Sequence, residues 1–408
     1  MSCAGLFLSG DPMSLEQDDV AMPKLTLPYD QTVLVLQGGG ALGSYQGGAY
    51  EVLHSHGVEP DWIAGISIGA INAAIIAGNA PQDRIGHLRE FWNEMSTDIP
   101  GGRLAGDLSS QSLRQFSGFL SLAAGVKAMF RPWFMLPWFN RPGTPEATSF
   151  YDTRPLRETL LRHVDFDRIN AGRLRLSLGA VNVRTGNFAY FDNRDPGHKI
   201  KPEHIMASAA LPPGFPAVEI DGEAYWDGGL VSNTPLSYVL DSGVAKATLV
   251  FQIDLFSAVG PLPQTMDEVQ ERVKDITYSS RTRMNTDAFL EKYRLRHAIR
   301  ALAEHVSDAD RKRLCEHKLP ADFFSDTNVS LTEGANGRVS LVHIINRSNR
   351  HEIQSKDFDF WRESVREHWR DGMADAREAM QAKAWRGFAD PDSGLAVYDY
   401  IRPDPSRP

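Results

Sequence analysis

The stretch that decides the fold reads TVLVLQGGGALG over residues 32–43 and DWIAGISIGA over residues 61–70. In each half, a short apolar run ends at a turn built from small residues. The two runs predict buried parallel strands, and each is followed by a segment of helical composition, residues 45–56 and 68–77. The second of these helices is apolar on every side and so belongs in an interior. Strand, turn and helix, repeated in this way, are typical of an α/β fold with a parallel sheet.

The rest of the chain continues this pattern before it changes character. Further strands are expected at residues 174–183, 187–191, 247–253 and 339–345, and helices at residues 266–317 and 358–380. Residues 1–28 are expected to form a disordered leader. An α/β domain should span residues 29–255, with an aromatic insertion at about 108–140. A mainly helical C-terminal extension with one strand is expected over residues 256–395, followed by a tail at 396–408.

Composition excludes several classes of protein. A formal charge of −9 and a pI near 5.8 argue against a nucleic-acid-binding surface, which needs a basic excess. The two cysteines, Cys3 and Cys315, lie too far apart in the chain for a disulfide framework or a cysteine-based zinc site. No apolar run is long enough for a transmembrane helix, and the N-terminus has no positive region typical of a signal peptide. We therefore expect a cytoplasmic protein, with peripheral membrane contact left open.

Residues 65–69, Gly-Ile-Ser-Ile-Gly, fit the pattern G-x-S-x-G between a predicted strand and a predicted helix. In that setting Ser67 lies on a tight, strained turn, and Gly65 and Gly69 avoid clashes with the adjoining strand and helix. The serine hydroxyl would project at a helix N-terminus, where the helix dipole favours developing negative charge. The pattern indicates a nucleophile, although a Gly-Ser turn with Ser67 as a helix N-cap would use the same residues.

Residues 38–43, Gly-Gly-Gly-Ala-Leu-Gly, lie in a similar position after the first strand. Consecutive glycines allow backbone amides to point into a cavity without obstruction by Cβ atoms, which suits an oxyanion hole. The same residues fit G-x-G-x-x-G of dinucleotide-binding folds. That interpretation requires an acidic residue at the end of the second strand. Here the strand ends in Gly65-Ile66-Ser67, and Asp61 lies at its other end, so the oxyanion hole is favoured.

A serine nucleophile needs a base to accept its proton, and Asp227 is the candidate. It lies in the sequence AYWDGGL, residues 224–230, between bulky aromatic residues and the pair Gly228 and Gly229. Burial beside aromatic residues raises the pKa of a carboxyl group, and the glycines allow a tight turn. An Asp-Gly-Gly sequence also forms ordinary hairpin turns. Taken alone, this motif therefore leaves the role of Asp227 open.

Histidines offer a competing base, because the triad of an α/β-hydrolase runs in the order Ser, Asp, His. The candidates are His297, His305, His343 and His351. None has a distinctive local setting, which favours ordinary surface or core histidines. A glycine-rich loop directly after the first strand also fits that fold poorly.

The three motifs together resemble the patatin-like phospholipase family, in which an oxyanion loop, a G-x-S-x-G elbow and a distant D-G-G follow in this order. Here they are Gly38 to Gly43, Gly65 to Gly69 and Asp227 to Gly229, and the resemblance covers roughly residues 34–255. It implies a three-layer α/β sandwich with a mostly parallel central sheet. The charged helices and strand beyond resemble the mainly helical C-terminal extension of a bacterial subgroup.

The resemblance also implies a mechanism, in which a Ser67–Asp227 dyad hydrolyses a lipid or ester substrate through an acyl-enzyme. The amides of Gly38, Gly39 and Gly40 would hold the oxyanion, supported by Gly43. Neither a cofactor nor a metal is expected, because all reacting groups belong to the protein. One departure is Leu42, where many relatives carry Arg or Lys, which leaves phospholipid preference less defined than acyl hydrolysis. The segment Ile205 to Pro216 resembles the family's packing element beneath the site.

The aromatic residues 113–139 are the candidate for a lid or a membrane contact, and packing against the core would explain them equally well. Two other classes of function remain as alternatives to the hydrolase. One is a catalytically silent lipid-binding or scaffold protein of the same fold, which would not need all three motifs. The other is the nucleotide-binding oxidoreductase, weakened by the missing acidic residue. The sequence says nothing about oligomeric state.

Overall fold

The computed structural model describes residues 27–98, 121, 123–241, 247–320, 338–347, 356–387 and 395–400. Its first elements follow the predicted order: β1 Gln31–Leu36, α1 Gly43–Ser55, β2 Trp62–Ile66 and α2 Ile68–Ala77. The remaining strands are β3 Arg131–Pro132, β4 Tyr151–Asp152, β5 Arg175–Asn182, β6 Phe188–Asp192, β7 Val218–Ile220, β8 Glu223–Asp227, β9 Thr248–Asp254, β10 Val339–Ile345 and β11 Leu395–Asp399. The remaining α-helices are α3 Arg84–Met95, α5 Pro145–Thr148, α6 Arg154–His163, α7 Phe166–Asn170, α8 Pro202–Ser208, α9 Leu236–Asp241, α10 Met266–Glu304, α11 Asp308–His317 and α12 Arg362–Gln381. Short 3-10 turns include η1 Gly40–Leu42, η3 Pro137–Phe139, η4 Gly228–Leu230 and η5 Lys356–Phe358.

Within the described residues, a nine-stranded sheet has the order β11-β10-β9-β1-β2-β5-β8-β7, with β6 also paired to β5. The pairs from β11 to β5 are all parallel, while β6, β7 and β8 form antiparallel pairs. Alternate residues of a strand face opposite sides of a sheet. In β1, Leu34 and Leu36 pack in the larger core, whereas Val33 and Val35 pack with α9 on the other side. The mostly parallel α/β sandwich is therefore confirmed.

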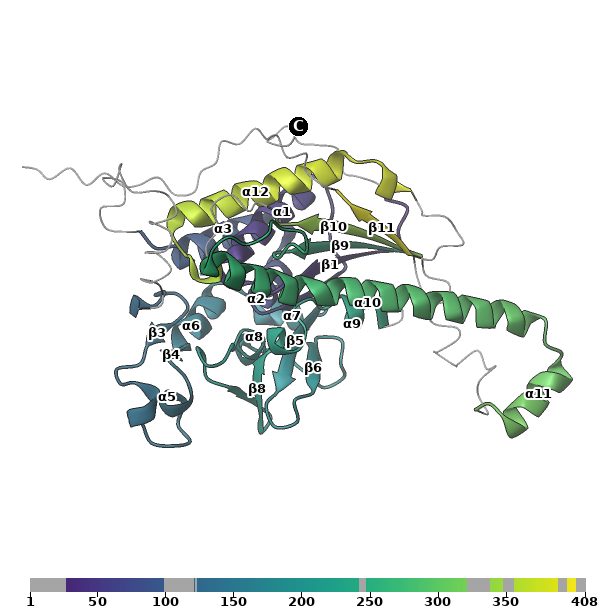
Figure 1. Cartoon of the computed structure of the whole chain (residues 1–408), viewed down its shortest axis with the longest axis horizontal. Helices are drawn as coiled ribbons and strands as arrows, with labels where there is room; N and C mark the ends of the chain where they lie inside the picture. Colours follow the sequence, from purple (N-terminus) through teal and green to yellow (C-terminus); the bar gives the residue numbers. More distant parts are fainter. Residues whose placement is uncertain are drawn as a thin grey trace, which may run out of the picture.

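The C-terminal part of the chain is built into this sandwich. Strand β10 pairs with β9 along its whole length, and β11 pairs with β10, so two strands beyond residue 255 extend the same sheet. The sequence predicted one strand beyond residue 255, and the structure adds a second, β11, which begins at Leu395 and continues to Asp399 in the stretch expected to be a tail. Helix α12 lies over α1 (Figure 1), and its Trp369 occupies the space beside Gly47 and Gly48. The leader falls almost entirely outside the described residues.

The long helix α10 runs across the molecule and ends near α11 (Figure 1). Strands β3 and β4 form a small antiparallel pair that closes a loop over residues 133–150, which we call the aromatic loop. Residues 108–120 and 122 of the predicted insertion lie outside the described part of the chain. None of the described helices is long and apolar enough to cross a bilayer.

Strand pairing at β5 brings two distant parts of the chain together. Strand β2 pairs with β5 as far as Ile66, which lies opposite Gly179. The next residue of β5, Ala180, lies opposite Asp227 of β8, while β6 occupies the other edge of β5 at both positions. Strand β8 therefore pairs with the same edge of β5 beyond the point where β2 ends. This register places Asp227 beside the turn that follows Ile66.

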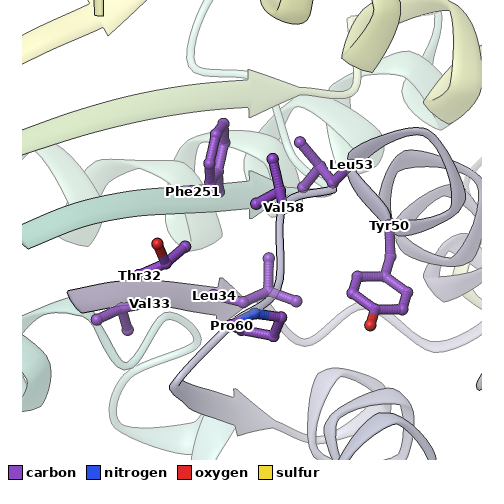
Figure 2. Close-up of a pocket in the computed structure, with 8 residues that line it drawn as sticks. All are labelled: Thr32, Val33, Leu34, Tyr50, Leu53, Val58, Pro60 and Phe251. Atoms are coloured by element: carbon purple, nitrogen blue, oxygen red, sulfur yellow. The ribbon is translucent and has the colours of Figure 1, made fainter. Parts of the chain in front are cut away.

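A small void of about 10 Å³ lies between β1, α1 and β9, lined by residues that include Leu34, Leu53 and Phe251. Figure 2 shows that its surroundings are mainly apolar side chains. A space of this size holds at most about one water molecule, and a water needs polar partners. The void is therefore a packing defect of the core and not a ligand site.

Candidate functional site

Ser67 occupies the turn between β2 and α2, with φ 57° and ψ −126°. A residue other than glycine with positive φ is strained, at a cost of roughly 1–3 kcal/mol, and such strain is concentrated at functional sites. The neighbouring glycines are needed because the chain is crowded here. A Cβ on Gly65 would overlap the backbone of Gly69, and a Cβ on Gly69 would overlap the carbonyl of Leu36. The spacing of the G-x-S-x-G pattern is thus a packing requirement.

A second serine supports this turn. The Ser67 amide donates a hydrogen bond to Ser208 Oγ at 3.1 Å, and the Ser208 hydroxyl donates to the carbonyl of Gly179 at 2.6 Å. Ser208 is the last residue of α8 and is fully buried. The sequence indicated only a packing role for residues 205–216, and no local signal distinguished Ser208 from its neighbours. Its hydroxyl connects α8 to β5 and to the strained turn.

Asp227 ends β8 and is almost completely buried, at 2% exposure. Burial raises the pKa of Asp227 to about 7, and its interactions with the Ser67 hydroxyl and the Gly229 amide only partly oppose this change. The Gly229 amide donates to Asp227 Oδ1 at 2.7 Å. Gly228 packs against the carbonyl of Gly179, where a Cβ would be crowded. The structure therefore brings together Ser67 and Asp227, which lie 160 positions apart by the numbering of the chain.

The glycine-rich loop after β1 contributes two amides to the same place. Gly39 and Gly40 line the cavity that contains Ser67 and Asp227, and within the described residues neither amide has a protein acceptor. Gly40 has φ +56°, and a Cβ there would overlap the carbonyl oxygen of Asp357. Gly43, at the start of α1, packs against Ile68 in the same way.

Gly38 has a different role from its neighbours. Its amide donates to the carbonyl of Asn233 at 3.0 Å, and Asn233 Nδ2 donates back to the carbonyl of Gly38 at 2.8 Å. This pair of bonds corrects the expectation that Gly38 lends its amide to an oxyanion hole, because that amide already has an acceptor. Gly38 instead joins the glycine-rich loop to the segment after η4 through these two hydrogen bonds. Asn233 is a residue of the site that no sequence pattern revealed.

These groups open into a cavity of about 410 Å³. Its size falls in the range of small-molecule sites, which are typically apolar with a few convergent polar groups. Ser67, Asp227 and Asn233 supply polar groups, and the walls carry many aromatic and aliphatic side chains, including Met129, Phe130, Phe150, Phe215, Phe256 and Phe360. The arrangement places a serine hydroxyl and a carboxylate in the wall of a mainly apolar cavity.

Comparison with known families bears on this arrangement. A family model described as Patatin-like phospholipase matches residues 34–240, just over half of the 408 residues. The chain belongs to the patatin-like phospholipase family. A second model, described as Patatin phospholipase, matches residues 276–392, which contain most of α10, β10 and α12. The chain is therefore a patatin-like phospholipase with a C-terminal extension, and the family supports a lipid hydrolase function.

Other comparisons add little to this patatin-like assignment. The curated proteins give no match. Among solved structures, the chain is similar to VipD from Legionella pneumophila, with 11% identity and a TM-score of 0.34, covering 92% of this chain and 72% of that chain. The family assignment rests on the two family models.

The C-terminal extension of this patatin-like chain forms one wall of the cavity. Lys274 and Tyr278 of α10 line it, together with Asp357 and Phe358 of η5. Lys274 Nζ lies 2.8 Å from Asp357 Oδ1, and the neighbouring Lys356 pairs with Asp275 at 2.9 Å. These ion pairs fasten η5 to α10 and hold the Asp357 carbonyl against Gly40. Sequence reasoning assigned no function to the extension, because its contribution depends on contacts across the fold.

The competing histidines do not gather at this site. Within the described residues, no histidine lines the cavity. His305 is exposed at the end of α10, and His297 lies within the same helix. His343 is buried in β10, and burial lowers its pKa to about 4. His351 lies outside the described residues. The geometry gives Ser67 a carboxylate neighbour and no histidine neighbour among them.

Proposed function

We propose that the protein is a serine carboxylic ester hydrolase for lipid acyl chains, with Ser67 as nucleophile and Asp227 as general base. One observation carries the proposal. A buried carboxylate, whose pKa is raised to about 7, interacts with the hydroxyl of a serine on a strained turn. A general base works best when its pKa lies near the working pH. An aspartate with an ordinary pKa near 4 would be a much weaker base.

The proposed reaction has two halves. Ser67 Oγ attacks the ester carbonyl carbon while its proton passes to Asp227, and the amides of Gly39 and Gly40 hold the resulting oxyanion. The intermediate collapses, and the leaving alcohol takes the proton from Asp227. In the second half, a water gives its proton to Asp227 and attacks the acyl carbon. Ser67 then regains that proton as the fatty acid is released.

The shape and chemistry of the cavity support an acyl substrate. Apolar burial is favourable by about 25 cal/mol per Å² of surface, so an acyl chain gains most by lying along the aromatic walls. The acyl carbonyl would then lie against the part of the wall that Ser67, Gly39 and Gly40 form. Leu42 is fully buried and so leaves oxyanion binding to backbone amides. This supports acyl-chain hydrolysis more directly than recognition of a phosphate head group.

We further propose that the aromatic loop touches the lipid surface from which substrate is drawn. Its exposed fractions are 102% for Phe134, 76% for Trp138 and 70% for Phe139. Clustered exposed apolar side chains of this kind mark an interaction surface. The base of the loop is part of the cavity wall, because Phe150 lines the cavity and accepts a hydrogen bond from the Trp133 amide. A membrane bound here would therefore lie beside the cavity. The cytoplasmic location expected from the sequence stays a prediction.

Replacing Phe134 by Ser is expected to weaken binding to phosphatidylcholine vesicles by about tenfold or more, because burying a phenylalanine side chain contributes about 1.5–3 kcal/mol. Vesicle co-sedimentation would measure it. Hydrolysis of a water-soluble short-chain ester should not change. Leu302→Ser, at a 69% exposed position near the far end of α10, is the matched control. Equal vesicle binding by Phe134→Ser and wild type would contradict the membrane contact.

The proposed nucleophile is tested by labelling with a fluorophosphonate, which reacts with activated serine hydroxyls. Wild type should be labelled at Ser67 and should hydrolyse p-nitrophenyl acyl esters or phosphatidylcholine. Ser67→Ala should lose both properties while keeping its fold. A wild-type protein that is neither labelled nor active would instead support a silent lipid-binding scaffold. Full activity in Ser67→Ala would place the chemistry elsewhere.

A further inference from the structure

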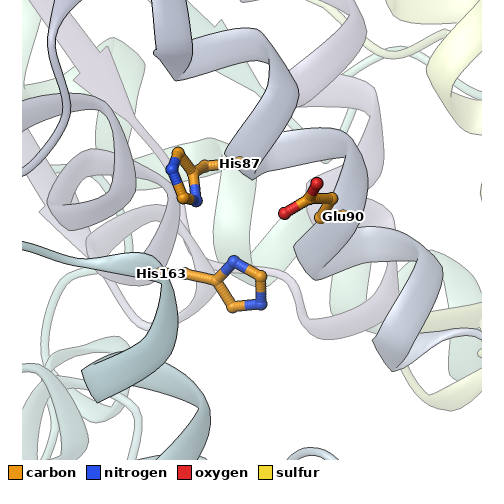
Figure 3. A group of neighbouring side chains, drawn as sticks. All are labelled: His87, Glu90 and His163. Atoms are coloured by element: carbon orange, nitrogen blue, oxygen red, sulfur yellow. The ribbon is translucent and has the colours of Figure 1, made fainter.

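Two helices bring together side chains that the proposed hydrolysis does not use. His87 and Glu90 lie three positions apart on α3, a spacing that places both on one face of the helix. His163 is the last residue of α6. One potential ligand atom from each of the three residues lies within 4.8 Å of the others. Figure 3 shows the two imidazole rings and the Glu90 carboxylate facing a common space.

One nitrogen of each histidine in this cluster has no hydrogen-bond partner among the described residues. Within the described part of the chain, the Nδ1 atoms of His87 and His163 are both buried and make no hydrogen bond. His163 is only 4% exposed. A buried polar atom without a partner costs about 1–3 kcal/mol, so two such atoms in one cluster call for an explanation.

The surroundings of His163 fix which of its nitrogens can bind a ligand. Its Nε2 lies 3.2 Å from Glu94 Oε1, and Glu94 also accepts a hydrogen bond from Arg162. An ionised carboxylate only accepts, so Nε2 carries the proton in this contact. In that tautomer Nδ1 carries a lone pair, and this atom faces His87 and Glu90 (Figure 3). A carboxylate behind a histidine is the usual support for a metal ligand, because it orients the ring and raises its basicity.

We propose that His87, Glu90 and His163 bind a zinc-class divalent cation. Two imidazoles and one carboxylate form a ligand set that zinc commonly takes, with a fourth position left for water. Glu90 is exposed, so water can reach that position. The sequence predicted no metal because His163 lies more than 70 positions beyond Glu90, too far for any spacing motif.

The position of the cluster indicates what the ion does. Helices α3 and α6 flank residues 96–153, which contain the aromatic loop and the cavity residues Met129 and Phe130. An ion bound to both helices closes a long loop, which is where a metal link removes the most conformational freedom from the unfolded chain. The bound ion would therefore link α3 to α6 and stabilise the fold by holding together the two ends of residues 96–153. It takes no part in the proposed chemistry at Ser67.

Zinc titration of tag-free, chelator-treated full-length protein by calorimetry tests the site. Wild type should bind one equivalent per chain and should melt at a higher temperature with zinc than without it. His87→Gln and Glu90→Gln should abolish this saturable binding, and Glu94→Gln should weaken it by about 10- to 100-fold, as loss of a supporting carboxylate does. His198→Ala, at an exposed histidine outside the cluster, should bind like wild type.

Cobalt provides a readout that is independent of stability. Bound to two imidazoles and a carboxylate, Co²⁺ should give visible absorption bands that are absent from His87→Gln. The proposal is overturned if wild type binds no stoichiometric zinc. It is also overturned if His87→Gln and Glu90→Gln bind zinc with wild-type affinity. Neither result depends on ester hydrolysis, so the metal site and the proposed function stand or fall separately.

Discussion

The Asp227→Asn variant should lose ester hydrolysis by about 10⁴-fold, the upper end of what a general base contributes, because Asp227 accepts a proton in both halves of the proposed reaction. The same variant should be more stable than wild type above pH 7. Burial raises the pKa of Asp227 from 3.8 to about 7, so its ionisation in the folded protein is unfavourable. Asn keeps an oxygen for the Gly229 amide and carries no charge.

The pH range of this stability difference follows from proton linkage. Between pH 3.8 and about pH 7 the folded protein holds a proton on Asp227 that the unfolded chain has lost, so wild-type stability falls as the pH rises. The difference between variant and wild type should be near zero below pH 4. Above pH 7 it should reach its full value, on the order of 4 kcal/mol. Wild-type kcat/KM should rise through the same range, with a midpoint near pH 7. Urea unfolding and ester hydrolysis across this range measure both.

Asp254 provides a matched control. Burial raises its pKa to about 7 as well, and Gln252 Nε2 donates to its Oδ2 at 2.6 Å. It lies outside the described cavity lining. Asp254→Asn should therefore gain stability above pH 7 and keep its activity. If Asp227→Asn retained wild-type turnover, or if both variants lost it equally, the base would be misassigned.

Gly40→Ala is expected to lower kcat by about 10²- to 10³-fold, the usual cost of losing one oxyanion donor. The substitution adds a Cβ where φ is +56° and where the Asp357 carbonyl lies against the backbone. The loop or η5 must shift, and the amides of Gly39 and Gly40 move with it. Since ground-state contacts along the cavity walls remain, KM should change less than kcat. Steady-state kinetics with a short-chain ester separate the two.

Gly186→Ala controls for the backbone conformation alone. Gly186 has φ +71° in the turn between β5 and β6, and a Cβ there meets nothing within 4 Å. Both variants carry the cost of an alanine in the left-handed region, about 1–2 kcal/mol. Only Gly40→Ala also disturbs the cavity. Equal kcat in the two variants would contradict the proposed role of the glycine loop in binding the oxyanion.

Local patterns predicted the parts of the site that depend on local geometry. The elbow at Ser67 was predictable because Gly65 is required by a contact within the same strand, turn and helix, and Gly69 by the end of β1, one unit earlier in the chain. The Asp-Gly-Gly sequence at Asp227 looked like an ordinary turn by itself. Asp227 lies near Ser67 only because β8 pairs with β5 beyond the point where β2 ends, and this pairing leaves no local signal. The proposed role of Asp227 was inferred from the order of three motifs in the sequence and not from its neighbouring residues.

Residues whose roles arise from long-range contacts gave no signal in the sequence. Ser208, Asn233 and His163 are common residue types in unremarkable surroundings, and each matters through partners far away in the chain. The strand at Leu395–Asp399 was missed because it is short and follows a charged, proline-containing stretch. It becomes a strand by pairing with β10, which the local pattern does not reveal.

The contact between Gly40 and Asp357 has a consequence for how the protein is made. A ribosome that has translated residue 255 has already produced Ser67, Asp227 and the whole glycine loop. It has not yet made η5, which presses on that loop, or β10, which covers the edge of β9. An uncovered strand edge invites pairing with other chains. The growing chain therefore carries Ser67 and Asp227 before the wall that closes their cavity has been made, and the proposed activity requires η5 to be in place.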